Sequence, residues 1–336
     1  MKTDSNLTVS NWMTTADVPN APVLTDNLET EVCIVGAGIS GLTTAYLLTK
    51  EGRRVVVLDD GAIASGESSR TTAQLSSVID DSYYNIADTF GEDGARLAYQ
   101  SHSAAIDTIE RIVREENIDC GFERLDGYLF GPAHQPTEVL DHELEAAQKA
   151  GFVEAEKVGR APLDGFETGP CLKFPHQAHF HPVRYFAAIA EIITRNGGQI
   201  FTNAHVVTVK GGDAPYVETD GGHRVLAQHI VVATNSPIND RVHLHTKQAA
   251  YRTYVIGVRV PKNSVAKALY WDTLDPYHYV RIQEESDHDL LIVGGEDHKT
   301  GQDENVSADE RYARLNVWTR EHFPSRKMSS FAGRDK

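Results

Sequence analysis

Three glycines with the spacing of a dinucleotide-binding turn are the residues of this sequence with the clearest chemical meaning. Gly36, Gly38 and Gly41 follow an apolar run at 32–35 and precede a helical pattern. In such a turn the first glycine permits the sharp bend, the second lets the backbone approach a pyrophosphate, and the third lets the helix pack close to the strand. The free N–H groups and the positive dipole end of the helix attract phosphate. The spacing therefore predicts that this turn binds a dinucleotide.

The elements expected around the glycines agree with this interpretation. The runs 32–35 and 55–58 are typical of strands buried on both faces, and the helix between them ends at Gly52. Asp59 follows the second run, 59 − 41 = 18 positions after Gly41. This is close to the ~20 positions at which an acid accepts hydrogen bonds from the adenosine ribose hydroxyls. The unit predicts either NAD or FAD, and its residues alone leave that choice open.

The composition excludes several classes of protein. The 336 residues suffice for two domains, or for one core with an inserted lobe. A formal net charge of −16 opposes nucleic-acid binding, which needs a basic surface for the phosphates. Cys33, Cys120 and Cys171 are widely separated and form no C-x-x-C, so we predict no disulfide framework, and we expect a cytoplasmic protein. No apolar run reaches the ~18 residues of a membrane span, so no membrane association is expected.

Two groups of histidines raise the question of a metal site. One group contains His176, His179 and His181, and the other contains His243 and His245. Neither group has carboxylates at ligand spacing, and His181 precedes the proline that opens a helix, where a polar cap is expected. We therefore predict no metal site.

The remaining patterns predict further helices and a second sheet. Helical periodicity covers 91–117 and 138–150, and a helix that begins at Pro182 is followed by strands near 199–210 and 230–233. The last third of the chain contains the alternating runs AYRTYVIGVRV, HYVRIQ and DLLIVGG, which are typical of an antiparallel sheet. In the first run, Arg252 and Tyr254 are expected on one face together with Ile256 and Val258. The pattern predicts an α/β fold with a parallel and an antiparallel sheet.

Three segments together resemble a known family. They are GAGISG at 36–41, the loop SSRTTAQLS at 68–76 and the strand end VVATN at 231–235. The sequence resembles the D-amino-acid oxidase and glycine oxidase class of FAD-dependent oxidoreductases over roughly residues 29–300. The segments WDTLDPYHYVRIQ and IVGGEDHKTG resemble a bacterial subgroup that is often joined to a Rieske iron–sulfur domain. The resemblance implies FAD rather than NAD.

The resemblance also assigns cofactor contacts to individual positions. It places the glycine turn at the pyrophosphate, Asp59 at the ribose where the family more often has glutamate, the loop after residue 69 along the phosphates and flavin, and a backbone position near the adenine. The residues concerned are Gly36, Gly38, Ile39, Ser40, Gly41, Asp59, Arg70, Thr71, Thr72, Val206, Ala233 and Thr234. The loop from Arg70 to Gln74 contains no histidine or cysteine of the kind that carries covalent flavin, so non-covalent FAD is expected.

The same resemblance implies a discontinuous domain organisation. Residues 1–28 are expected to be a surface leader, and 29–85 with 160–236 an FAD-binding Rossmann-like domain with a parallel sheet. Residues 86–159 and 237–315 are expected to form an inserted α+β substrate domain with an antiparallel sheet. The tail 316–336 has no strand period and lacks the family's last glycine-rich turn, so a truncated end is expected.

The implied chemistry is oxidation of a C–N bond in an amine or amino acid by hydride transfer to flavin. Candidates to hold the substrate's carboxylate are Arg252, Tyr254 and Arg281, although an arginine on a strand is more often solvated or salt-bridged. Oxygen, a quinone or a Rieske-type protein could accept the electrons. Two alternatives remain at this point. One is an NAD-dependent dehydrogenase, and the other is a truncated, catalytically silent nucleotide-binding protein.

Overall fold

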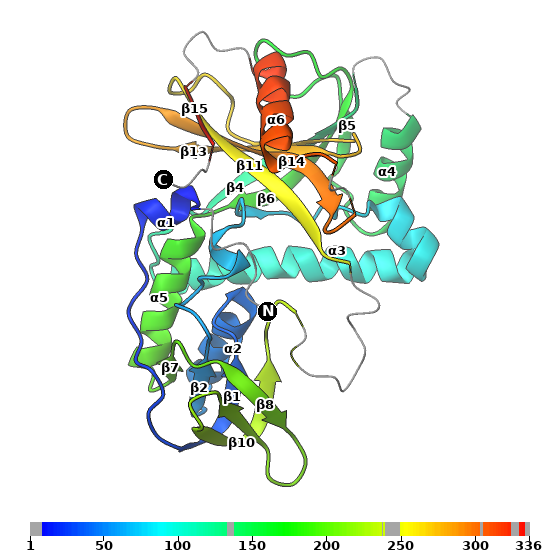
Figure 1. The fold of residues 1–336 in the computed structure, drawn as a ribbon. Helices are drawn as coiled ribbons and strands as arrows, with labels where there is room; N and C mark the ends of the chain where they lie inside the picture. The colour runs from blue at the N-terminus through cyan, green and yellow to red at the C-terminus, as the bar shows by residue number, and fades with distance from the viewer. Residues whose placement is uncertain are drawn as a thin grey trace. The chain divides into compact units, whose positions relative to one another are not determined.

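A computed structural model describes residues 9–132, 138–236, 238, 249–302, 305–323 and 329–332. The chain forms two compact units, which are described separately (Figure 1). Unit 1 consists of Met1–Thr71, Ile118–Cys120 and His181–Ala249. Unit 2 consists of Thr72–Asn117, Gly121–Phe180 and Ala250–Lys336. His243 and His245, considered above as metal ligands, lie outside the described residues.

Unit 1 is built on a six-stranded sheet. The strand order is β7 (Gln199–Phe201), β2 (Val55–Leu58), β1 (Leu28–Val35), β10 (Arg224–Val232), β9 (Tyr216–Thr219), β8 (Val206–Lys210). The first four strands are parallel, and β10, β9 and β8 continue as an antiparallel meander. All four residues of β2 are buried, as expected for a strand covered on both faces. The helices α2 (Ile39–Lys50) and α5 (Pro182–Arg195) pack against each other in this unit.

The helix α5 begins as its sequence predicts. Pro182 occupies the first turn, and the His181 side chain accepts a hydrogen bond from the Arg184 backbone N–H at 3.3 Å. This contact satisfies one of the free N–H groups at the helix start. The prediction that His181 is a helix cap is therefore confirmed.

The described part of the expected leader is anchored in unit 1. It contains the short helix α1 (Asn11–Thr15), whose Trp12 is only 2% exposed. The Trp12 indole N–H donates to the Thr71 carbonyl at 2.8 Å, and Leu24 is also buried. The sequence analysis predicted a surface leader from the many polar residues of this segment and did not consider these two large apolar side chains. Their burial stabilises the docked conformation of the segment.

Unit 2 is built on a larger, mainly antiparallel sheet, which confirms the predicted second sheet. The strand order is β15 (Ser329–Ala332), β11 (Tyr251–Val260), β14 (Asp289–Lys299), β13 (His278–Glu284), β12 (Leu269–Asp272), β4 (Glu123–Phe130), β6 (Cys171–His179), β3 (Gln74–Leu75), and β5 (Glu156–Val158) pairs with β6. Only β12 and β4 pair in parallel among these described strands.

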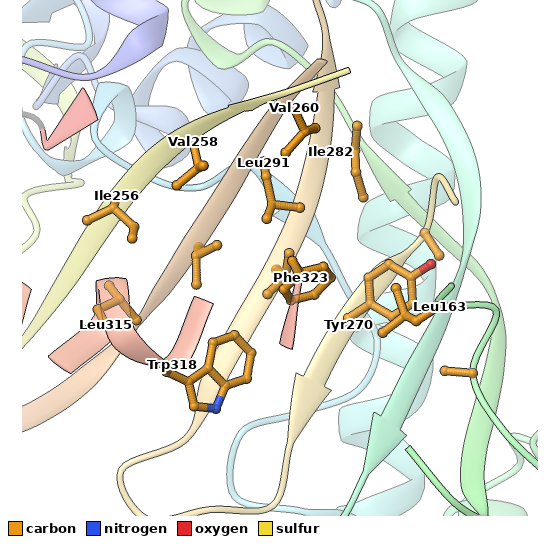
Figure 2. Packing of buried hydrophobic residues seen from close by; sticks show 14 of the residues in the cluster. Leu163, Ile256, Val258, Val260, Tyr270, Ile282, Leu291, Leu315, Trp318 and Phe323 are labelled. Carbon is orange, nitrogen blue, oxygen red and sulfur yellow. The ribbon is translucent and has the colours of Figure 1, made fainter. Parts of the chain in front are cut away.

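Different helices cover the two faces of this sheet. The helix α6 (Ala308–His322) packs on one face over the buried cluster of Figure 2, in which Ile256, Val258 and Leu291 point toward Leu315 and Trp318. The helices α3 (Tyr83–Glu115) and α4 (Glu138–Lys149) contribute to a second cluster around Phe152 and Phe174. Gly91 interrupts α3 with a φ of 78°, so the predicted helix 91–117 is the longer part of a kinked element.

Two expected boundaries and the expected tail differ from the described structure. Residues 72–85 and 160–180 belong to unit 2, because β3 and β6 pair with each other inside the larger sheet. Residues 329–332 form a strand although no strand period was predicted there. This strand pairs with β11, with Ser329 opposite Arg259, through backbone hydrogen bonds. Every residue type provides those backbone groups, so the side-chain pattern gave no signal for the strand.

No helix in the described part of the chain is both long and apolar enough to cross a bilayer.

Candidate functional site

The glycine turn lies between β1 and α2, and two of its glycines are required by the fold itself. Gly36 has a φ of +110°, and a Cβ there would lie 2.6 Å from the Ala233 carbonyl oxygen. A Cβ on Gly41 would lie 1.8 Å from the Gly36 carbonyl oxygen. Real Cβ atoms do not approach oxygen so closely, so both positions exclude side chains. These two glycines close the turn and pack the helix against the strand.

Gly38 is different, because packing does not require its lack of a side chain. Within the described residues, a Cβ on Gly38 would meet only the Ser68 hydroxyl oxygen, at 3.1 Å. Its backbone, with φ −85° and ψ −171°, is open to any residue. The one close neighbour of a Gly38 side chain would therefore be the end of a rotatable side chain, which can move to let a ligand approach the backbone. This is the place where the dinucleotide fingerprint brings the pyrophosphate.

The helix N-terminus beside Gly38 is suited to an anion. Gly38 is the N-cap of α2 and supplies no capping side chain, while Ile39 and Ser40 are exposed. The Ile39 N–H donates to the Ser68 hydroxyl at 3.1 Å. The positive end of the helix dipole adds to these N–H groups. Ser68 was not among the predicted contacts, although it belongs to the SSRTTAQLS loop that the family resemblance singled out.

Asp59 braces the glycine turn from the end of β2. Its carboxylate accepts the Ala37 N–H at 2.5 Å and the Gly61 N–H at 2.9 Å. Burial is the largest influence on Asp59 and raises its pKa, while the two backbone N–H groups oppose that rise. Each carboxylate oxygen has further acceptor capacity, so Asp59 can brace the turn and still receive ribose hydroxyls.

The other predicted cofactor positions of unit 1 lie at different distances from this turn. The Ala233 N–H donates to the Val35 carbonyl at 2.8 Å, which places the end of β10 beside the glycine turn (Figure 1). The Thr234 hydroxyl donates to the Ser236 carbonyl at 2.7 Å. Val206 opens β8, three strands away from β1, and has a register shift beside it. The ends of β1, β2 and β10 thus converge, as in α/β folds that bind ligands at the carboxyl ends of their strands.

Arg70 shapes the loop that follows β2. Its guanidinium donates to the Gly66 carbonyl at 3.0 Å and to the Ser65 carbonyl. The Arg70 Nε atom is buried and has no hydrogen-bond partner within the described ranges. Thr71 is exposed at its side chain and receives Trp12 at its carbonyl, and the next residue, Thr72, begins unit 2. Arg70 therefore holds the loop closed and retains a donor for a further acceptor.

The three substrate-side candidates are not brought together in unit 2. Tyr254 points to the face covered by α6, where its ring lies 5.1 Å from that of Tyr312. Arg252 is exposed, and the register against β14 shifts by one residue between Arg252 and Tyr254. Arg281 is fully buried on the opposite face from Tyr254. The shared face expected for Arg252 and Tyr254 stays a prediction, because the extra residue of this bulge lies on β14.

The Arg281 guanidinium binds main-chain carbonyl groups. Its Nη1 donates to the carbonyl oxygens of Thr72 at 3.1 Å, Ala73 at 2.9 Å and Phe180 at 3.1 Å. Its Nη2 donates to the Gln283 side chain at 2.7 Å. Burial lowers the pKa of Arg281 to about 9, so it remains a cation at neutral pH. These contacts occupy N–H groups with which a guanidinium would bind a carboxylate.

Sequence reasoning missed a group of acids and phenols on the sheet face opposite α6. The Tyr279 hydroxyl lies 3.2 Å from that of Thr253, and the Tyr277 hydroxyl donates to the Asp80 carboxylate at 3.4 Å. Burial raises the pKa of Tyr279 to about 12, with help from Asp297 and Asp80, and burial also raises the pKa of Asp297. The strand alternation in HYVRIQ could have placed Tyr279 on the same sheet face as Arg281. The acids and the threonine that lie near the tyrosines come from distant parts of the sequence and could not be predicted in this way.

Comparison with known proteins identifies the family. A family profile described as DAO, FAD dependent oxidoreductase, matches residues 31–334. The chain belongs to this family. The resemblance inferred from the glycine turn, the SSRTTAQLS loop and the VVATN strand end is confirmed, and with it the preference for FAD over the NAD alternative.

Two curated relatives show how this DAO-family chain compares in length. It is 32% identical to the putative Rieske 2Fe-2S iron-sulfur protein YhfW of Bacillus subtilis over 88% of this chain and 58% of the relative. It is 26% identical to gamma-glutamylputrescine oxidoreductase of Escherichia coli over 70% of this chain and 55% of the relative. The chain thus spans little more than half the length of these relatives. The first match supports the predicted Rieske-linked subgroup.

Solved structures with low sequence identity share the fold of this DAO-family chain. Glycine oxidase from Geobacillus kaustophilus superposes with a TM-score of 0.69 at 18% identity, over 89% of this chain and 79% of that one. L-proline dehydrogenase from P. horikoshii superposes with a TM-score of 0.68 at 16% identity, over 91% of this chain and 82% of that one. These matches confirm the predicted fold class.

Proposed function

We propose that this chain binds FAD without a covalent bond and oxidises a C–N bond of an amine or amino acid. The observation that carries the proposal is that Gly38, which no backbone contact requires to be glycine, caps an exposed helix N-terminus. Backbone packing requires glycine at positions 36 and 41, but it does not require glycine at position 38. A pyrophosphate approaching the backbone supplies a reason for glycine at that position.

The predicted contacts divide the cofactor among several segments of the chain. Gly36, Gly38, Ile39, Ser40 and Gly41 would hold the pyrophosphate, and the remaining contacts would hold the ribose, the adenine and the flavin end. Those remaining residues are Asp59, Arg70, Thr71, Thr72, Val206, Ala233 and Thr234. The buried Nε donor of Arg70 fits an acceptor on the cofactor. Bound FAD would accept a hydride from the substrate carbon, which is chemistry that amino-acid side chains cannot supply.

The thiols of this chain support dissociable FAD. Cys33, Cys120 and Cys171 are fully buried, and none of them forms a disulfide. Burial raises the pKa of Cys33 to about 12 and that of Cys171 to about 11. A protonated, buried thiol is a poor nucleophile for attaching a flavin. Reduced thiols also fit the cytoplasmic location that we propose for the protein.

The substrate's amine end is the part that unit 2 is best suited to hold. Asp80 and Asp297 contribute carboxylates near the phenols of Tyr277 and Tyr279, a set that attracts an ammonium group. The raised pKa of Asp297 brings its carboxylate closer to the range of a general base, so it can accept the ammonium proton. Tyr279 stays protonated at neutral pH and can donate a hydrogen bond.

A panel of substrates tests this function. The protein is loaded with FAD under anaerobic conditions, and the flavin absorbance is followed as amines and amino acids are added one at a time. Bleaching by at least one C–N compound is the expected result. Re-oxidation is then tested with oxygen, a quinone and a Rieske-type protein, the three proposed acceptors. A loaded protein that no amine or amino acid bleaches, but that a compound without nitrogen does, would contradict the proposed reaction.

A further inference from the structure

We propose that Arg281 is a positioning residue that holds residues 72–73 in a strained conformation and so presents the preceding residues, 70–72, to the cofactor. The inference rests on the proposed binding of FAD. It gives Arg281 a role other than holding a substrate carboxylate. All of the contacts that carry it lie in unit 2.

Arg281 joins two segments that are far apart in the sequence. One Nη1 atom donates to the carbonyl oxygens of Thr72, Ala73 and Phe180, within 2.9 to 3.1 Å. The three oxygens share the two N–H groups of Nη1, and the Nη2 bond to the Gln283 side chain at 2.7 Å fixes the plane of the guanidinium, whereas the ammonium of lysine is a single point on a flexible chain. The Thr72 and Ala73 carbonyls are therefore both directed at Nη1 of Arg281.

Ala73 has the backbone conformation that this arrangement imposes. Its φ is +59°, in the left-handed region that alanine rarely adopts, and its side chain is 1% exposed. Residues held in such conformations persist where the surrounding structure over-determines them, and they gather at functional sites. Here Arg281 binds the carbonyl on one side of the residue, and β3 begins on the other side at Gln74.

The segment after Ala73 is fixed as well. Gln74 and Leu75 pair with His179 and Ala178 of β6. The buried Gln177 side chain then accepts the Ser77 N–H at 2.7 Å. Because the chain from 73 to 77 is held at several points, the residues just before it leave from a fixed position and in a fixed direction. Those residues, Arg70 to Thr72, are the ones assigned to the phosphates and flavin.

The charge next to this segment comes from Arg281 and not from the neighbouring histidine. Burial, Arg281 and Lys267 lower the pKa of His179 to about 2, so His179 is neutral. The other charged groups near His179 are Glu123, whose carboxylate lies 3.5 Å from His179 Nε2, and Lys267, which pairs with Glu123 and Glu284. Arg281 therefore holds the segment through both its hydrogen bonds and a charge that it keeps at neutral pH.

The test measures FAD affinity in a double-mutant cycle of Arg281→Lys and Ala73→Gly. Arg281→Lys should weaken FAD binding by roughly tenfold or more, because Ala73 can relax to an ordinary conformation. Ala73→Gly alone should leave the affinity unchanged, since Arg281 already enforces the left-handed state. In the lysine background Ala73→Gly should restore about fivefold, because glycine adopts this conformation without strain. The bound-flavin absorption spectrum should shift in Arg281→Lys and return in the double variant.

Two further variants keep the result interpretable. Arg259→Lys changes an exposed arginine on β11 of the same sheet and should have no effect. Ala73→Pro forces φ to about −65° while leaving Arg281 in place, so it should weaken FAD as Arg281→Lys does even if the latter fails to fold.

The outcomes separate the two proposals. Parent-like FAD affinity and spectrum in Arg281→Lys or in Ala73→Pro overturns the positioning role. So does a gain from Ala73→Gly that is equal in both backgrounds, which would indicate a contribution to general stability only. A parent protein that binds no FAD overturns the proposed function itself, before Arg281 is considered.

Discussion

Gly38→Ala should distinguish the role of the glycine turn in ligand binding from its role in folding. The added methyl group would meet only the Ser68 hydroxyl, at 3.1 Å, and a hydroxyl at the end of a rotatable side chain can move aside. Alanine is a poorer N-cap than glycine, so we expect a loss of up to about 1 kcal/mol in the free energy of unfolding. In the absence of cofactor the variant should therefore fold and melt much like the parent.

The effect of Gly38→Ala on FAD should be larger. The methyl group occupies the space through which a pyrophosphate reaches the N–H groups at the start of α2. Losing one hydrogen bond to a charged group costs about 1.5–3 kcal/mol. At 1.4 kcal/mol per factor of ten, the dissociation constant of FAD should rise roughly 10- to 100-fold.

The matched control is Gly41→Ala in the same turn. Its methyl group would lie 1.8 Å from the Gly36 carbonyl oxygen, and backbone must move to admit it. We expect a loss on the order of 3 kcal/mol or more in folding stability, with or without cofactor. Thermal melts of the FAD-free proteins and titrations with FAD, followed by flavin fluorescence, measure both quantities. The reasoning is refuted if Gly38→Ala binds FAD as the parent does, or if it is as unstable as Gly41→Ala.

Three further predictions concern buried groups and the cofactor bond. The pKa of His179 is lowered to about 2 in the folded protein, whereas a histidine in the unfolded chain has a pKa of about 6.5. Below pH 6.5 the unfolded chain therefore binds one more proton at this residue than the folded protein does. Lowering the pH from 7.5 to 5.0 should therefore destabilise the parent by about 2 kcal/mol more than His179→Gln, and equal losses in urea titrations would count against it. Burial raises the pKa of Glu143 to about 7, so the effect of this residue on the free energy of unfolding has the opposite pH dependence. The protein loses stability as pH rises from about 4.5 to 7. Glu143→Gln should remove up to about 3 kcal/mol of that loss, and a variant with the parent's pH dependence would exclude this assignment. Acid precipitation should release all flavin into the supernatant, whereas a yellow washed pellet would indicate a covalent bond.

Much of unit 1 could be predicted because its signals are local. The run from β1 to Asp59 places strand, turn, helix, strand and acid within residues 28–59, and each type follows from neighbouring positions. The cap of α5 is local in the same sense. The alternation of β11, β13 and β14 likewise predicted the antiparallel sheet of unit 2. What these signals could not give is which residues meet across the sequence.

The roles in unit 2 depended on such distant partners. Arg281 contacts Thr72 and Ala73, more than 200 positions away, so its sequence context suggested a substrate contact and gave no sign of the carbonyls. The one-residue bulge of β14 beside Arg252 and Tyr254 was not predicted either. The packing of Trp12 in unit 1 depends in the same way on Thr71, which is 59 positions away.

The most direct test of the central claim is the identity and amount of cofactor bound by this chain. The purified protein is saturated with an equimolar mixture of FAD, FMN and NAD, freed of unbound ligand, and denatured with acid, and the released nucleotides are separated and quantified. The account predicts FAD at one equivalent per chain, with little FMN because FMN lacks the adenosine ribose assigned to Asp59. Release of NAD in place of FAD, or of no nucleotide at all, would contradict it.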